Sequence, residues 1–194
     1  MATTFNTIFN KFKLDPVQAR KKSQAWWENQ VKSLGAKPKA SALMRNSNAN
    51  NRGNFIVGNL YMFYYDAKHK DTLPYWDKFP CIFPFSIQSD SVIGLNFHYL
   101  PFGARIFLLD SLLSINNTKV NSKTQLQLSW ATISKVSKLN FAQVCVHKYL
   151  LNHIQSPLKW IDPENWSVAI NLPVAQFVGN NGKPIRANKI WGSI

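Results

Sequence analysis

Three short apolar segments between residues 60 and 100 limit the folds open to this chain. Residues 60–65 form a continuous aromatic run, residues 81–88 are apolar but contain Pro84, and residues 92–100 place apolar side chains on one face. Runs of this length, rich in aromatic and β-branched residues and bounded by turn residues, predict strands. Proline has no backbone N–H to donate, so we expect the second strand at a sheet edge or with a bulge. The sequence therefore predicts an antiparallel sheet in the middle of the chain.

The segments after Pro101 have a different pattern, because their apolar residues recur every three or four positions. This spacing predicts helices, which we place near residues 106–113, 126–136 and 144–151. Residues 166–172 alternate again and predict a last strand that closes the sheet. The fold class that we expect is α+β: a small, strongly curved antiparallel sheet, like an SH3-like barrel, packed with several helices.

The N-terminal segment predicts a basic helical arm in front of this body. Asp15-Pro16 combines an N-cap residue with proline at the first helical position, and Gly35 is a C-terminal stop. Residues 20–22 place three cations in the early turns, where the helix dipole disfavours positive charge. Cations kept at such positions indicate an anionic partner.

The positive charge of the chain is concentrated at its two ends. The chain carries 23 Lys and Arg against 9 Asp and Glu, a net charge of +14. We divide it into a basic N-terminal helix and flexible linker (1–57, net +8), a globular α+β body (58–178, net +3) and a basic C-terminal tail (179–194, net +3). A globular body with basic extensions is typical of a protein with a polyanionic partner. A generally basic surface kept for solubility would give the same net charge.

The candidate nucleic-acid-binding residues are cations of the two ends together with one tryptophan. Trp26 lies near the cations at 20–22, so it either stacks on a terminal or unpaired base or docks the helix onto the body. The full predicted set is Arg20, Lys21, Lys22, Trp26, Lys37, Lys39, Arg45, Arg52, Lys183, Arg186 and Lys189.

No arrangement of residues predicts catalysis. Magnesium-dependent hydrolysis needs converging carboxylates, and only Asp66, Asp71 and Asp77 share one loop. Lysines alternate with them, a pattern typical of a solvated surface. The four histidines lack zinc-ligand spacing, and no glycine-rich phosphate loop is present. We predict no metal, no cofactor and no enzymatic activity.

Compartment is indicated by the apolar runs and the cysteines. No run approaches the roughly 18 apolar residues of a membrane span, so we expect no membrane partner. The N-terminus is too polar for a secretory signal. Cys81 and Cys145 each lie inside an apolar run, which predicts two buried free thiols and favours an intracellular protein.

Two aromatic motifs are similar to those of a known family. The first spans Leu60–Pro80 and continues in Gly94–Pro101, and the second comprises Trp160–Trp166 and Ala169–Pro173. Together they resemble the DNA end protector family of T-even-like tailed phages, over about residues 58–178. The resemblance implies a virion protein bound at the ends of the packaged linear genome, which it shields from host exonuclease on injection. It also implies a location in the phage particle and, after synthesis or injection, in the host cytoplasm.

Three functional hypotheses follow. The first is non-enzymatic binding and capping of double-stranded DNA ends, which predicts a preference for free ends over closed circles. The second is a structural or assembly protein of the phage head, neck or baseplate without end specificity, which predicts a stoichiometric virion partner. The third is a DNA-processing enzyme, which the scarcity of carboxylates opposes. The sequence does not predict the oligomeric state.

Overall fold

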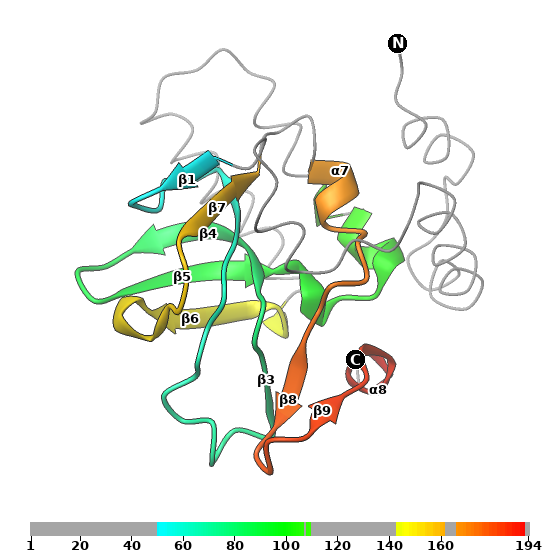
Figure 1. The fold of residues 1–194 in the computed structure, drawn as a ribbon. Coiled ribbons are helices and arrows are strands. Elements are labelled where there is room, and N and C mark those ends of the chain that lie inside the picture. The colour runs from blue at the N-terminus through cyan, green and yellow to red at the C-terminus, as the bar shows by residue number, and fades with distance from the viewer. Residues whose placement is uncertain (1–49, 107, 110–142, 162–165, 193–194) are drawn as a thin grey trace, which may run out of the picture.

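The computed structural model describes residues 50–106, 108–109, 143–161 and 166–192 (Figure 1). The strands of this part form two antiparallel sheets. The larger has six strands in the order β1-β7-β2-β4-β5-β6, and the smaller has three in the order β3-β8-β9. The strands of the larger sheet are β1 (Asn50–Arg52), β7 (Leu158–Ile161), β2 (Leu60–Met62), β4 (Cys81–Ile87), β5 (Ser91–Asn96) and β6 (Val146–Leu150). Those of the smaller sheet are β3 (Tyr75–Asp77), β8 (Phe177–Gly179) and β9 (Pro184–Ile185).

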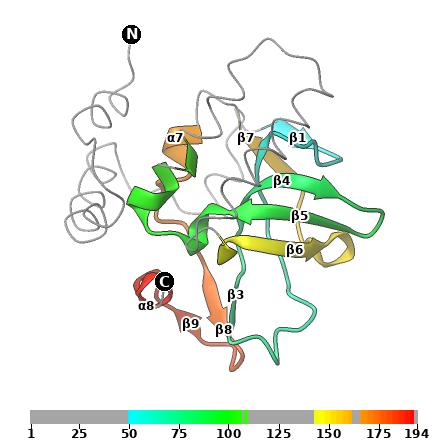
Figure 2. The ribbon, with the colours of Figure 1, turned by 180° about the vertical axis from the view of Figure 1, so that it is seen from behind.

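The named helical elements are short. They are the 3₁₀ turns η1 (Phe97–Tyr99) and η2 (Leu151–His153) and the α-helices α7 (Trp166–Ala169) and α8 (Ala187–Trp191). Residues 102–106 and 108–109 are also helical. The small sheet and α8 lie on the β6 side of the large sheet in both views (Figures 1 and 2). No helix in the described ranges has the length and apolar character needed to cross a membrane.

The β4–β5 hairpin forms as its residues dictate. The register shifts between Pro84 and Ser86, which confirms the predicted bulge. Gly94 lies opposite Pro84, and a Cβ atom there would lie 3.0 Å from the carbonyl oxygen of Phe83. A side chain at this position would therefore push the two backbones slightly apart, and glycine avoids that shift.

The large sheet is buried on both faces, because successive residues of its strands point to opposite sides. In β2, Leu60 and Met62 join the first core, whereas Tyr61 joins the second. Phe63 and Phe97 have no exposed surface and Trp166 is 1% exposed, which confirms their predicted burial. Cys81 and Cys145 are buried free thiols, as predicted.

The expected fold class was wrong. The regular secondary structure of the described residues is mostly strand with only short helices, and the sheets are neither closed nor strongly curled, so no SH3-like barrel packed with several helices is formed there. Residues 144–151 were expected to be helical, but Val146–Leu150 pairs with β5 along five residues. Trp166, expected to start a strand, instead starts α7. The expected strand from Val92 ends at Asn96, whose side chain caps η1 by accepting a hydrogen bond from the N–H of His98.

Other expected elements lie outside the described residues. These are the N-terminal helix over residues 15–34, most of the linker and the helix near 126–136. At the boundary, β1 pairs antiparallel with β7, and Phe55 packs in the second core. Residues 50–57 therefore pack with the body.

Candidate nucleic-acid interface

Three of the predicted cations are carried by the C-terminal unit formed by β8, β9 and α8. Lys183 lies in the turn between β8 and β9, Arg186 is the N-cap residue of α8, and Lys189 lies within α8. All three side chains are exposed. Arg52 is the last residue of β1, paired with Leu158. The remaining predicted residues lie outside the described part: Arg20, Lys21, Lys22, Trp26, Lys37, Lys39 and Arg45.

The C-terminal unit is fixed to the body by a buried arginine and a tryptophan. The Nε1 atom of Trp191 donates a 2.8 Å hydrogen bond to the carbonyl oxygen of His98. Arg105 has no exposed surface, and its guanidinium donates to the carbonyl oxygens of Leu100, His98 and Ile170. The same guanidinium lies 5.1 Å from the ring centroid of Trp191, within cation–π range. The three exposed cations thus stand on a docked element.

The loop carboxylates do not converge on a metal site. Asp77 is buried, and its Oδ2 atom accepts hydrogen bonds from Nδ1 of His98 at 2.8 Å and from Nδ2 of Asn96 at 3.1 Å. Its Oδ1 atom accepts from the backbone N–H groups of Phe79 and Gln176. In the described part of the chain, no three His, Cys, Asp or Glu residues are grouped to hold a metal ion.

The pair of Asp77 and His98 has a structural role. Burial alone would raise the pKa of Asp77, but the charge and hydrogen bond of His98 and the hydrogen bonds from Asn96 and Phe79 bring it below its ordinary value. Burial lowers the pKa of His98, against the opposing effect of Asp77. The carboxylate of Asp77 is therefore ionised at pH 7, and its Oδ2 atom accepts the hydrogen bond from Nδ1 of His98. Because neither side chain has exposed surface, the pair does not meet substrate.

Of the other two loop carboxylates, Asp66 pairs with Lys70 at 3.0 Å, one helical turn away in sequence. Asp71 is exposed. The predicted reading of this loop as a solvated surface holds for these two residues but not for Asp77, which the β3–β8 pairing draws inside.

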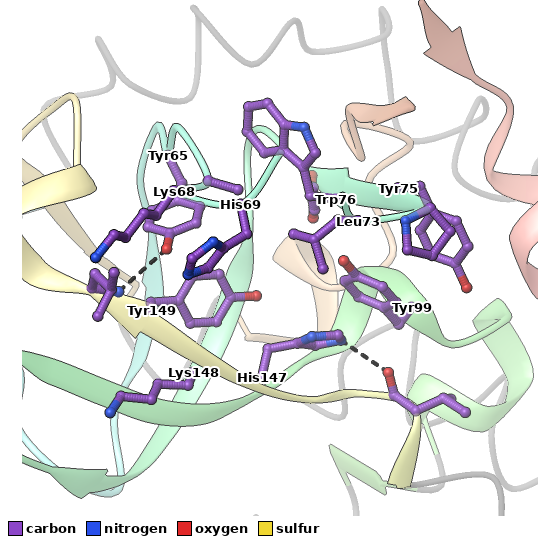
Figure 3. A pocket seen from close by; sticks show the side chains of 15 residues that line it. Tyr65, Lys68, His69, Leu73, Tyr75, Trp76, Tyr99, His147, Lys148 and Tyr149 are labelled. Carbon is purple, nitrogen blue, oxygen red and sulfur yellow. Dashed lines mark hydrogen bonds between the residues drawn. The ribbon is translucent and has the colours of Figure 1, made fainter. Parts of the chain in front are cut away.

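A pocket of about 510 Å³ lies between the segment 65–77 and β6 (Figure 3). This volume is within the roughly 300–1,000 Å³ that small-molecule sites occupy. Its lining is rich in rings that come from four separate stretches of the chain. The lining rings are Tyr65, His69, Tyr75, Trp76, Tyr99, His147 and Tyr149.

Most of the ring-bearing wall is packed into the body and held in place. Tyr65, Trp76, Tyr99 and Tyr149 are 4–7% exposed. The hydroxyl of Tyr149 accepts from Nδ2 of Asn96 at 2.9 Å, and the hydroxyl of Tyr65 accepts from the N–H of Leu150. Such rings offer a preformed apolar surface with little conformational freedom left to lose.

Charge at the pocket is positive at its opening. Lys68 and Lys148 line it and are exposed. Asp77 is the one carboxylate among the described lining residues, and its oxygens are taken up by the hydrogen bonds given above. His147 stacks on Tyr99 with ring centroids 3.9 Å apart, and burial lowers its pKa to about 4. That imidazole is neutral at pH 7 and donates from Nε2 to the carbonyl oxygen of Val144.

Sequence reasoning missed this pocket. It predicted a strand for residues 60–65 and a helix for residues 144–151, which include Tyr149. A usable signal was the recurrence of Lys beside aromatic residues at Lys68 and Lys148, but only the pairing of β5 with β6 shows that these segments meet.

The chain was compared with protein-family models, curated proteins and solved structures. No curated protein and no solved structure matches the chain. A protein-family model described as Phage T4 terminal DNA protecting protein matches residues 3–194. The match extends the resemblance beyond residues 58–178 to both basic ends. Because it covers nearly the whole chain, the protein belongs to the Phage T4 terminal DNA protecting protein family, which confirms the family predicted from the aromatic motifs.

Proposed function

We propose that this protein binds and caps the double-stranded DNA ends of a packaged phage genome and so protects them from host exonuclease on injection. The observation that carries the proposal is the family match over residues 3–194, whose description names protection of terminal DNA. The charge distribution supports it, since duplex DNA is a dense line of negative charge and cations at both ends of the chain are suited to its phosphates.

On this proposal the protein protects a DNA end by covering it and does not catalyse a reaction. An end-binding protein needs tight contacts around the terminus and needs no activated water. Asp77 is committed to a buried hydrogen-bond network, and Asp66 is paired with Lys70. Cations outnumber carboxylates by more than two to one along the whole chain. These observations support a non-enzymatic role.

The partners on this proposal are DNA ends, with the cations of both termini as the phosphate contacts. Lys183, Arg186 and Lys189 are exposed on the C-terminal unit that Arg105 and Trp191 dock onto the body. The six predicted cations of 20–45 supply the larger share of the charge. The protein would be carried in the phage particle and enter the host cytoplasm with the genome.

The decisive experiment is a competition between linear and covalently closed circular DNA of the same sequence. We expect the linear form to compete far better per molecule, and we expect the same result in EDTA. In a second measurement, the protein should block an end-dependent exonuclease without shortening or nicking the DNA itself. Equal competition by circles, together with a stoichiometric virion partner, would instead support a structural protein of the head, neck or baseplate. Nicking or shortening that disappears on changing Asp66, Asp71 or Asp77 would show an enzyme.

The contribution of the N-terminal segment is measured by truncation. The deletion should end at residue 48, because β1 starts at Asn50 and Phe55 packs on Tyr61 with ring centroids 5.1 Å apart. If about six cations of the segment contact phosphates, the slope of log K against log salt should become shallower by about 5. The melting temperature should change little. Unchanged DNA affinity would contradict a role for the N-terminal segment.

A further inference from the structure

The aromatic pocket between the segment 65–77 and β6 is not used by the cation contacts described so far. We propose that it receives the unpaired terminal base of a DNA strand, an inference that rests on the proposed end-binding function. A base at a free end has no neighbour on one side, so it leaves the stack at a lower cost than an internal base. A pocket that accepts one base therefore recognises an end by chemistry that the interior of a duplex does not offer.

The lining of the pocket fits a flat aromatic ligand. Tyr75 is partly exposed, and Tyr99 and His147 stack on each other beside it. Figure 3 shows His69 among the rings that line the pocket. Stacking on such rings is tolerant of sequence, because every base has a π-face. A protein that caps termini of varied sequence needs this tolerance.

The charges around the pocket fit a nucleotide better than a neutral aromatic ligand. Lys68 from the segment 65–77 and Lys148 from β6 both line the pocket and are exposed. They are placed to meet the phosphates that flank a base held between them. The buried carboxylate of Asp77 accepts four hydrogen bonds from the protein, so it presents no free acceptor to oppose the phosphates.

The pocket is also linked to the basic C-terminal unit by strand pairing. Tyr75 in the pocket wall pairs with Gly179, and the turn that follows Gly179 carries Lys183. Figure 1 shows the loop between β2 and β3 and the β8–β9 turn at the same end of the molecule. A strand that places its terminal base in the pocket would thus run its backbone toward exposed cations already assigned to phosphate.

The first test blocks the pocket without removing core packing. Val144 is 38% exposed and lines the pocket, so Val144→Trp places a ring in the opening. Ile87 is 45% exposed and does not line it, so Ile87→Trp is the matched control. We expect Val144→Trp to weaken binding to linear duplex with single-stranded overhangs by roughly tenfold, the size of one lost base stack. Binding to closed circles should not change, and Ile87→Trp should behave as wild type.

A second pair of variants guards against misfolding of the first. Leu73 lines the pocket and is 37% exposed. Leu73→Glu adds a carboxylate that repels phosphate, whereas Leu73→Gln has the same shape without the charge. We expect overhang binding to fall for Leu73→Glu well below that for Leu73→Gln, with equal melting temperatures. If Val144→Trp and Leu73→Glu both bind the overhanging duplex with wild-type affinity, the pocket proposal is overturned.

The third test locates the base. Duplexes carry 5-iodouracil either at the terminal unpaired position or inside the duplex, and irradiated complexes are digested and sequenced by mass spectrometry. We expect the terminal position alone to crosslink to peptides that contain Tyr75, Tyr99 or Tyr149. Terminal crosslinks confined to other peptides would overturn the proposal.

Failure of the pocket proposal and failure of the proposed function are distinguishable. Preference of the wild-type protein for linear over circular DNA tests end binding and does not depend on the pocket variants. If that preference is present and Val144→Trp and Leu73→Glu leave overhang binding intact, only the pocket proposal fails. If a short acidic aromatic peptide binds the pocket more tightly than a short oligothymidine, the pocket serves a protein partner and the proposal is overturned.

Discussion

The two faces of the six-stranded sheet are both apolar, but different elements pack on them. The first core is covered by α7, α8 and the C-terminal strands, and its members include Trp166, Ile170 and Ile190. The second core is a cluster of rings in edge contact, among them Phe63 with Tyr149 at 5.7 Å and Tyr65 with Tyr149 at 5.0 Å. The second core contributes Tyr65, Trp76 and Tyr149 to the pocket wall, whereas of the members of the first core only Tyr99 lines the pocket.

This difference separates stability from binding within one sheet. Tyr149 lies on β6. Its ring packs in the second core and also lines the pocket. Substituting a ring that has both roles is expected to destabilise the fold. Leu73 and Val144 line the pocket but are exposed, so substituting them should not lower the stability in the same way. The predictions below test this separation, starting from the sealed face.

The largest effect is expected in the sealed core. Trp166 is 1% exposed, packs edge-to-face on Phe83 and donates from Nε1 to the carbonyl oxygen of Ile161. Trp166→Ala should lower the free energy of unfolding by about 3–5 kcal/mol, because it leaves a cavity and an unpaired acceptor. Denaturant unfolding measures this, with Ile87→Ala as an exposed control within about 0.5 kcal/mol of wild type. A near-wild-type value for Trp166→Ala would show that this face is not sealed.

The next effect concerns the clamp that holds the C-terminal unit on that face. Burial lowers the pKa of Arg105 to about 9, so the guanidinium remains charged at pH 7. Arg105→Met would leave the carbonyl oxygens of Leu100, His98 and Ile170 without this donor. We expect a loss of about 3 kcal/mol in the free energy of unfolding, against less than about 0.5 kcal/mol for the exposed Arg186→Met. Equal effects would place both arginines outside the core.

Much of the middle of the large sheet could be predicted from the sequence, because its determinants are local. The strand residues of β2, β4 and β5 follow from short apolar runs, and the bulge follows from Pro84, which cannot complete the ladder. Burial of Phe63 and Phe97 follows from their place in those runs. These inferences needed no knowledge of partners far along the chain.

The elements that were predicted wrongly depend on distant partners or on competing local signals. Val146–Leu150 has apolar residues at spacings that suit a helix, and only pairing with β5 fixes it as a strand. Trp166 and the residues after it alternate like a strand, yet Trp166–Ala169 is helical, and the order Asp162-Pro163 just before it in the sequence is typical of a helix start. The pocket joins rings from four stretches, so no single stretch of sequence reveals it.

A smaller effect is expected on the pocket side when pH is lowered. His147 has a pKa of about 4 in the folded protein, below its ordinary value of 6.5. Its contribution to stability is therefore complete above about pH 6.5 and is lost as pH falls to about 4. We expect a loss on the order of 2 kcal/mol from this residue between pH 7 and pH 4.

The variant His147→Gln keeps a donor for the carbonyl oxygen of Val144 but does not titrate. Unfolding measured as a function of pH should show a shallower decline for this variant. Asp77, His98 and Asp90, whose pKa values are also lowered in the folded protein, contribute to the remaining decline. Identical pH profiles for wild type and His147→Gln would mean that the imidazole is solvated, and the pocket wall looser than the structure has it.

The smallest effect on stability, and the one that most sharpens the comparison, comes from single cations on the two sides. Lys148 is exposed at the pocket, and Lys183 is exposed in the turn of the C-terminal unit. Lys148→Gln and Lys183→Gln should each change the free energy of unfolding by less than about 0.5 kcal/mol.

If both lysines contact phosphates, each substitution should make the slope of log K against log salt shallower by about 0.7–0.9, the lower figure applying to contacts with single-stranded DNA. For blunt duplex the effect of Lys148→Gln should shrink toward zero, because no unpaired strand reaches the pocket, while that of Lys183→Gln should persist. The measurement is fluorescence anisotropy across a salt series with blunt and overhanging duplexes of one sequence. Equal slopes for Lys148→Gln on both duplexes would mean that the second face does not distinguish a free strand from a paired one. The assignment of stability to the first face and of end recognition to the second would then be wrong.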